Sequence, residues 1–244
     1  MTKTPQLPVT DLAETCTQPE EVQWTYLRRL ARARPKGSYL PTRKFSSDIM
    51  NVQDPMFGEG PATPWSKIEP LVRGECWNDY ILQANLAAAK AIHNYVMRHR
   101  ISGRHMSDVL AFQLGIMGFV TRFWEPTALV EDGELSLVFL DLRRKFGLTS
   151  AGRNIVYSVM NEHVRKTYEP YAKAHMRVFQ LTDTEDREVV VFDARAEALP
   201  LLSYDELQQR IDLTYSIWMR VLAERAEYER TNDDGGPLFG GKSA

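Results

Sequence analysis

Cysteine is scarce in this sequence, and long apolar runs are missing. Its two cysteines, Cys16 and Cys76, are too few and too far apart for a disulfide framework or a cysteine-based zinc finger. The most apolar run, residues 109–123, is broken by polar residues and glycines and is shorter than the roughly 20 residues of a membrane-spanning helix. The N-terminus, MTKTPQLPVTD, lacks the apolar core of a signal peptide. These absences predict a soluble, cytoplasmic protein with no membrane partner.

The short motifs of common enzymes and metal sites are also missing. The sequence contains no nucleotide-binding glycine loop, no nucleophile-elbow serine motif and no cysteine–histidine pairing. No two histidines have the i, i+4 spacing of a zinc protease, and no acid completes a ligand set at a known interval. We therefore expect no enzymatic activity, no metal ion and no other cofactor. His163, on the inner face of a predicted helix, is expected to be a hydrogen-bonded core residue.

Charge is distributed unevenly along the chain, although the net charge is only −2. Residues 24–47 hold seven bases and no acid, and residues 143–177 hold eight bases and two acids. Residues 183–230 hold twelve acids and six bases. Basic segments of this kind predict contact with nucleic acid. The alternative is a set of solvated faces whose charges cancel in space.

Residues 1–74 contain nine of the thirteen prolines. Because proline fixes φ and removes a backbone donor, we expect an extended, basic, Pro-rich N-terminal arm with one short helix over residues 20–34. Aromatic residues lie between its bases, a pattern that favours phosphate tracking and base stacking. A helix with a solvated basic face is the alternative. The candidate nucleic-acid-binding residues of the arm are Arg28, Arg29, Arg32, Arg34, Lys36, Arg43 and Lys44.

Helical periodicity begins near residue 75. Apolar residues three and four positions apart predict helices over 75–99, 107–123, 134–146 and 151–168. The third of these would place Leu135, Val138, Phe139, Leu142 and Phe146 on one side, with Gly147 as its C-terminal cap. The capping box SYDE at 203–206 opens one more helix, to about residue 229.

Two β-rich runs, 176–181 and 188–193, predict a hairpin with a polar tip. The expected fold class is therefore mainly α. A helical domain over 75–230 carries a two-stranded wing-like β-hairpin and follows the extended arm. The glycine-rich tail over 231–244 is predicted to be disordered.

The outward face of the helix over 151–168 is the sharpest candidate site. Its polar side chains recur at spacings of four, three and four residues, so that they share one face: Asn154, Ser158, Asn161 and Arg165. Asparagine and arginine can bond base edges, whereas lysine and arginine at the margin of such a face meet phosphates. The basic residues that flank this face are Arg153, Lys166 and Lys173. An ordinary solvated helix face is the alternative.

Helix, turn, helix and hairpin follow one another from residue 135 to residue 193. This order resembles the winged helix-turn-helix superfamily and, within it, the MarR-like regulators. The segment TDTEDREVVVFD is similar to a MarR-type wing, in which an Asp-Arg pair ends the tip before the second strand. The resemblance implies that Arg187 is the wing-tip residue, reaching the minor groove or its phosphates. A hairpin of this kind can equally be a packing device.

These patterns together predict a non-enzymatic DNA-binding protein, with RNA as an open alternative target. Its expected role is that of a transcriptional regulator or a plasmid or mobile-element accessory factor. An apolar stripe of the 203–229 helix either forms a homodimer seam or closes the core: Leu207, Ile211, Tyr215, Trp218 and Leu222.

The rival hypothesis is a structural subunit of a larger assembly, with a protein partner for the N-terminal arm. Spaced aromatic and apolar residues of the arm would dock on that partner: Tyr39, Phe45, Met56, Phe57 and Trp65. The PLF of the tail is a second candidate docking peptide.

Overall fold

A computed structural model describes residues 6–32, 38–53, 61–106, 111–114, 119–122 and 127–233. Its helices are α1 (Val9–Thr15), α2 (Glu20–Arg32), α3 (Leu40–Lys44), α4 (Ser46–Ile49), α5 (Trp65–Gly74), α6 (Asp79–Arg98), α7 (Ser150–Met160), the π-helix η2 (Asn161–Arg165), the 3₁₀ turn η3 (Glu169–Tyr171), α8 (Ala194–Glu197) and α9 (Tyr204–Asp233). Its strands are β1 (Val52–Gln53), β2 (Ser102–His105), β3 (Ala111–Leu114), β4 (Phe119–Arg122), β5 (Thr127–Glu131), β6 (Glu134–Asp141), β7 (His175–Leu181) and β8 (Val189–Asp193).

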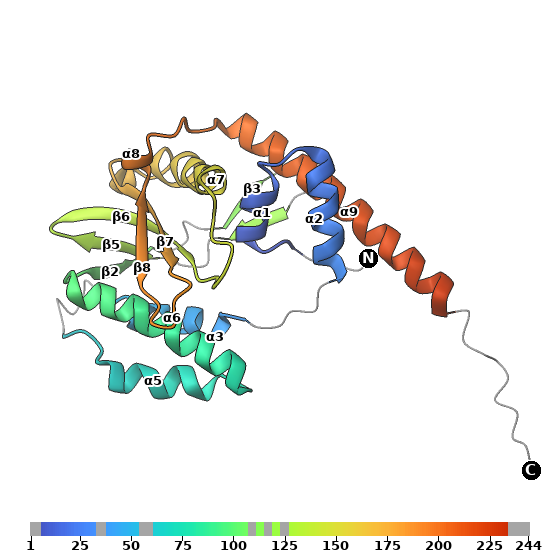
Figure 1. Ribbon diagram of the computed structural model, residues 1–244. Coiled ribbons are helices and arrows are strands. Elements are labelled where there is room, and N and C mark those ends of the chain that lie inside the picture. The colour runs from blue at the N-terminus through green and yellow to red at the C-terminus, as the bar shows by residue number, and fades with distance from the viewer. Residues whose placement is uncertain are drawn as a thin grey trace, which may run out of the picture.

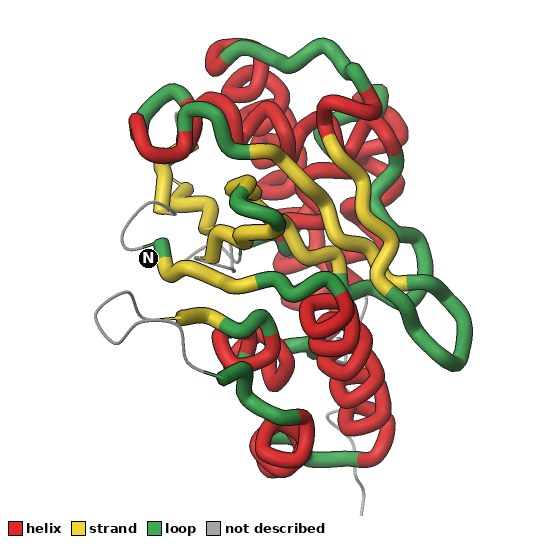
Figure 2. Tube along the Cα trace, turned by 90° about the vertical axis from the view of Figure 1, so that its left-hand side faces the viewer, coloured by secondary structure: helices red, strands yellow, loops and turns green. Residues whose placement is uncertain are grey.

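A six-stranded mixed sheet organises these elements, in the order β1-β2-β5-β6-β7-β8 (Figures 1 and 2). Two neighbouring pairs are parallel, β1 with β2 and β6 with β7, and the other three pairs are antiparallel. The register of the central pair sets Leu137 beside Met176 and Phe139 beside Val178. Strands β3 and β4 form a separate antiparallel pair.

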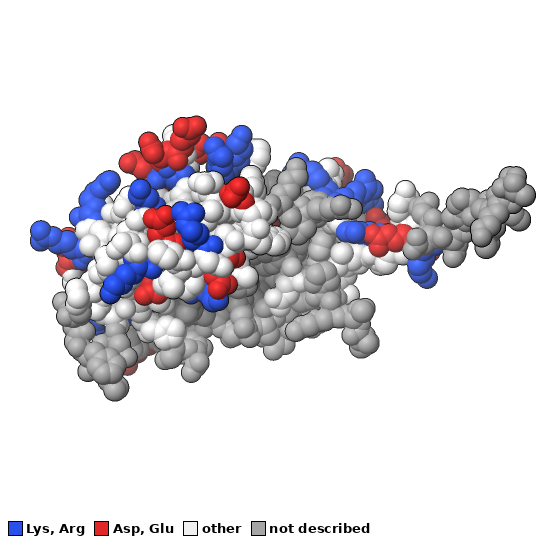
Figure 3. Space-filling model, turned by 90° about the horizontal axis from the view of Figure 1, so that it is seen from below, with Lys and Arg blue, Asp and Glu red and all other residues white. Residues whose placement is uncertain are grey.

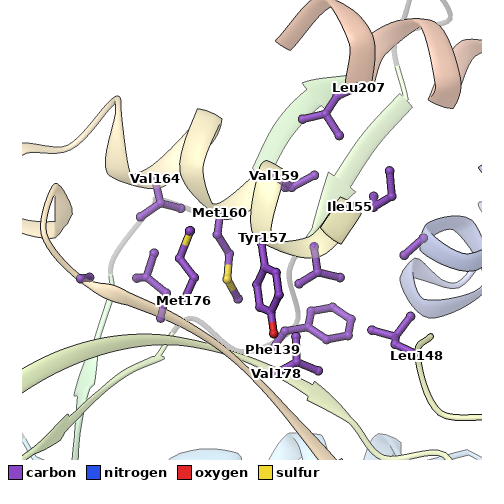
Figure 4. Packing of buried hydrophobic residues seen from close by; sticks show 14 of the residues in the cluster. Phe139, Leu148, Ile155, Tyr157, Val159, Met160, Val164, Met176, Val178 and Leu207 are labelled. Carbon is purple, nitrogen blue, oxygen red and sulfur yellow. The ribbon is translucent and has the colours of Figure 1, made fainter. Parts of the chain in front are cut away.

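Each face of the sheet carries its own apolar core. On one face Leu137, Phe139, Met176 and Val178 pack against α7, and Figure 4 shows Tyr157 of that helix pointing into the cluster. On the other face the alternate strand residues pack against α6 and its neighbours α4 and α5. Burying one large aliphatic or aromatic side chain stabilises the fold by about 1.5–3 kcal/mol.

A third core joins α2 to α9 beside the sheet. Leu27, Ile211 and Trp218 are among its buried members. Figure 1 shows α9 running along α2 and then continuing beyond the body of the protein. Its residues 223–231 are exposed, which fits the charged sequence there.

The expected fold class, a helical domain with a lone two-stranded hairpin, is wrong. The 134–146 helix is absent, because residues 134–141 form the central strand β6. Helices cover both sides of this strand, so consecutive apolar residues face opposite cores, and the resulting apolar run imitates a helical pattern. The 107–123 helix is wrong where the structure describes that segment, since 111–114 and 119–122 are strands.

The extended arm is also wrong for the described part of residues 1–74, which holds five helices and a short strand. Several prolines lie where helices begin, although Pro70 lies inside α5. Pro8 and Pro64 stand at N-cap positions, and Pro41 lies in the first turn of α3. Because the first residues of a helix need no intrahelical N–H donor, proline is tolerated there.

Several local predictions are confirmed. Helices α2 and α6 occupy the predicted segments, and α7 with η2 covers most of 151–168. The capping box opens α9, since the Glu206 carboxylate accepts hydrogen bonds from the amide and the hydroxyl of Ser203, each at 2.8 Å. Strands β7 and β8 form the predicted hairpin, although as two strands of the larger sheet. The residues of the predicted disordered tail from 234 onward lie outside the described residues.

Candidate functional site

The polar face of α7 is covered by the segment that joins β8 to α9. Arg153, whose side chain is 11% exposed, donates from Nε to the Glu197 carboxylate at 2.8 Å and stacks on the Phe192 ring. The same carboxylate accepts a hydrogen bond from the Tyr157 hydroxyl at 2.8 Å. Hydrogen bonding to Arg153 lowers the pKa of Glu197, and burial raises the pKa of Tyr157. This ion pair fixes α8 on α7.

Two further residues of that face hold the same segment. The Asn154 amide donates to the carbonyl of Pro200 at 3.0 Å. The hydroxyl of Ser158, which is fully buried, accepts from the amide of Leu202 at 2.9 Å. Both therefore bind the protein's own backbone, and the predicted outward face is an intramolecular interface at these positions.

The remaining candidates from 161 to 173 lie near the end of α7. The Asn161 amide donates to Glu162, and Lys166 forms an i, i+4 ion pair with the same glutamate at 2.6 Å. Arg165 donates to the carbonyl of Ala172 at 3.0 Å. Lys173 is exposed. The positions of these residues do not by themselves test the predicted contacts with DNA.

Arg187, the predicted wing-tip residue, points inward and is 9% exposed. Its guanidinium donates to the carbonyls of Leu142 and Arg143 at 3.1 and 2.9 Å, and to the Tyr39 hydroxyl at 3.2 Å. A minor-groove contact needs a side chain that projects from the tip, whereas this one holds the tip against the loop after β6. The hairpin is therefore a packing device at Arg187.

The basic residues of the predicted arm are engaged within the protein to different degrees. Arg28 pairs with Glu224 of α9 at 3.1 Å and lies over the Trp24 ring, and Arg29 lies over the Tyr26 ring. Arg43 donates to the carbonyl of Leu140 at 3.1 Å, Lys44 pairs with Glu75 at 2.7 Å, and Arg32 is exposed. Arg34 and Lys36 lie outside the described residues.

Basic and acidic side chains are interspersed over the described part of the face that Figure 3 shows. No continuous basic patch is visible on that part. Some exposed bases of the described part pair with acids from distant segments, as Lys44 does with Glu75.

The predicted docking residues of the arm are mostly core residues. Tyr39, Phe45 and Trp65 pack partly buried against the α6 side of the sheet. Met56 and Phe57 lie outside the described residues, as does the PLF of the tail. The apolar stripe of α9 is likewise covered by the same chain, Leu207 in the core with α7 and the other four residues in the core with α2, so it closes the core and is not a free dimer seam.

The positions of the histidines test whether the described residues could form a metal site. Within the described ranges, no three histidine, cysteine or acidic residues cluster closely enough to hold a metal ion. His163 is packed near Tyr204, and burial lowers the pKa of its imidazole.

No helix in the described part of the chain is both long and apolar enough to cross a membrane.

One exposed feature was missed by helical periodicity, the connection from β6 to α7, here called the 142–149 loop. Phe146 in this loop is 88% exposed and has a φ of 56°. Helical periodicity had predicted Phe146 on the apolar side of a helix over 134–146. Its position beside Gly147 and after three consecutive bases, Arg143, Arg144 and Lys145, was the available signal for a turn.

The comparison with protein families shows which family the chain belongs to. The model of the family described as "Sliding clamp-binding bacterial toxin SocB" matches residues 10–228. The chain belongs to this family. A relative from Caulobacter vibrioides, "DNA replication inhibitor toxin SocB", is 26% identical over 236 residues, which cover 97% of this chain and 98% of that protein. No solved structure matches the chain.

Membership of the SocB family corrects the functional predictions. The resemblance to MarR-like winged-helix regulators is wrong, and so is the transcriptional role inferred from it. DNA was the wrong class of partner, because the family is described by its binding to a sliding clamp, which is a protein. The family match and the Caulobacter relative also contradict the predicted roles of assembly subunit and plasmid accessory factor. Interspersed charge and internally engaged arginines agree with this correction.

Proposed function

We propose that this chain binds a bacterial sliding clamp in the cytoplasm and thereby inhibits DNA replication, acting by binding and not by catalysis. The observation that carries the proposal is the family match over residues 10–228. It runs from α1 to the projecting end of α9 and so includes members of all three apolar cores.

The alignment with the Caulobacter relative adds support from chain length. It covers nearly the whole of both proteins, so the similarity is not confined to one segment. The relative is named as a DNA replication inhibitor. A protein that occupies a clamp competes with the clamp's other partners, and inhibition of DNA synthesis is the expected consequence.

The test is a binding assay followed by a synthesis assay, both with the full chain. Purified bacterial sliding clamps, that of Caulobacter vibrioides among them, are immobilised, and the chain is passed over them in a concentration series. We expect saturable binding with a dissociation constant in the micromolar range or tighter, about −8 kcal/mol or better. Primer extension by a clamp-dependent polymerase should then fall as the chain is added and recover when free clamp is added in excess.

Clamp-independent primer extension with the same template is the matched control. It should be unaffected, because the chain has no target there. Failure to bind any of the clamps would overturn the proposal. Equal inhibition with and without the clamp would overturn it as well, since it would point to the polymerase or the template as the target.

A further inference from the structure

Strand β8 is the last strand of the six-stranded sheet, so only one of its two edges is paired. Its partner β7 is antiparallel, and Thr182, directly after β7, donates from its amide to the carbonyl of Glu188 at 2.9 Å. Opposed residues of an antiparallel pair alternate between hydrogen-bonded and non-hydrogen-bonded positions. Counted along the register from this bond, Val190 bonds to β7, whereas Val189 and Val191 direct their N–H and C=O groups away from it.

The outward edge of β8 has no partner in the described part of the chain. Among those residues, no hydrogen bond reaches the outward amides or carbonyls of Val189 and Val191. Soluble proteins commonly protect such an edge with lysine, proline or a bulge. The strand reads VVVFD, its register is unbroken, and Val190 is 40% exposed. An apolar edge without this protection is a template for a further strand.

The charges at the two ends of β8 differ in sign. Three exposed acidic residues lie at the end where the strand begins: Glu185, Asp186 and Glu188. Arg195, whose side chain is 63% exposed, lies at the other end. A second β8 that runs antiparallel brings the acidic end of each strand beside the Arg195 end of the other. A parallel arrangement would instead place like charges side by side.

We propose that β8 pairs with β8 of a second copy of this chain, so that two six-stranded sheets join across a two-fold axis. With Val191 at the axis, the Val191 amide of each copy donates to the Val191 carbonyl of the other. Val190 then lies opposite Phe192 of the second copy, on the α7 side of the sheet, and aromatic and β-branched residues are favourable cross-strand partners. The same residues serve both copies, as a two-fold interface requires. This pairing does not depend on clamp binding.

Val191→Pro tests the pairing, because proline lacks the outward N–H while the hydrogen bonds between β8 and β7 remain. Size-exclusion chromatography with light scattering gives the mass of the full chain over a concentration series. An interface of one strand edge is small, so we expect a weak dimer, present at roughly 100 μM and dissociated at about 1 μM. Val191→Pro removes two hydrogen bonds from this dimer and should raise its dissociation constant by about tenfold or more.

Val190→Lys is a second variant, which leaves the backbone unchanged. Lysine on an exposed edge opposes strand pairing, so this variant should also stay monomeric. Val22→Lys is the matched control, since Val22 is 47% exposed but lies on α2, and it should dimerise as the wild type does. Circular dichroism and the urea midpoint check that each variant is folded.

A wild-type chain that is monomeric at roughly 100 μM overturns the proposal. Equal dimerisation of Val190→Lys and the wild type overturns it as well, and so does an equal loss in Val22→Lys. If the wild type is monomeric and Val190→Lys loses affinity for an immobilised sliding clamp, the edge belongs to the clamp and not to a second copy. A dimer that forms without any clamp supports the pairing, whether or not the chain then binds a clamp.

A charge exchange tests the antiparallel direction. Glu188→Arg places like charges at both ends of the interface, and so does Arg195→Glu, so each variant alone should dimerise more weakly than the wild type. An equimolar mixture of the two variants restores opposite charges at both ends and should recover the dimer. No recovery in the mixture contradicts the antiparallel pairing, as does unchanged dimerisation of the single variants.

Discussion

Replacing Arg187 with alanine gives the sharpest test of the corrected view of the hairpin. The guanidinium is 9% exposed and donates at 2.9 and 3.1 Å to the carbonyls of Arg143 and Leu142. Hydrogen bonds that involve a charged group contribute about 1.5–3 kcal/mol each, and their removal leaves two carbonyl oxygens with unmet bonding capacity. Recovered solvation of the lost charge offsets part of this. We expect Arg187→Ala to lower the free energy of unfolding by about 3–5 kcal/mol.

Urea unfolding followed by circular dichroism measures this loss as a shift of the midpoint at an unchanged slope. Arg144→Ala is the matched control, because its ion pair with Asp183 is solvent-exposed and should contribute at most about 1 kcal/mol. Arg187→Lys keeps the charge but loses the planar fork that serves several acceptors, so an intermediate loss is expected. A loss below about 1 kcal/mol in Arg187→Ala would refute the reasoning and restore a projecting wing-tip side chain.

Two further predictions concern ionisation. Arg153 lowers the pKa of Glu197 below its ordinary value of 4.5, so the stability that this pair provides is complete above about pH 5 and is lost as pH falls through the folded-state pKa. The difference in unfolding free energy between the wild type and Glu197→Gln should therefore shrink from pH 6 to about pH 3, and a constant difference would contradict this. Burial raises the pKa of Cys16 to about 12, whereas Cys76 is only partly buried. Iodoacetamide with mass-spectrometric mapping should modify Cys76 in the native protein and Cys16 only after denaturation; equal labelling would place Cys16 in contact with solvent.

The polar face of α7 shows what helical periodicity can predict and what it cannot. Spacing placed Asn154 and Ser158 together on one face, and the structure confirms a helix there. What covers that face is set by Glu197, Pro200 and Leu202, which lie more than 40 residues along the chain. A helical pattern states which residues are neighbours on a surface. It does not state whether the surface meets solvent, DNA or another segment of the same chain.

Strand β6 illustrates the converse limit. Leu137 and Phe139 face one core, and Val138 and Leu140 face the other, so the four consecutive residues 137–140 are all apolar. A strand buried on both faces loses the alternation that would mark it, and a helical spacing can then be found among its residues. β6 pairs in parallel with β7, with Ser136 opposite His175. No local sequence signal predicts this pairing.

The sequence by itself determined the elements whose signals are local. The capping box of Ser203 and Glu206 started α9, and the two β-rich runs paired as β7 and β8. The tertiary structure alone decided the six-stranded sheet, the inward direction of Arg187 and the exposure of Phe146. The physical reason is range: caps, turns and periodicity act within a few residues, whereas sheet pairing and burial join residues far apart in the chain. Such distant contacts explain why the polar face of α7, which was predicted to contact DNA, packs against the segment between β8 and α9.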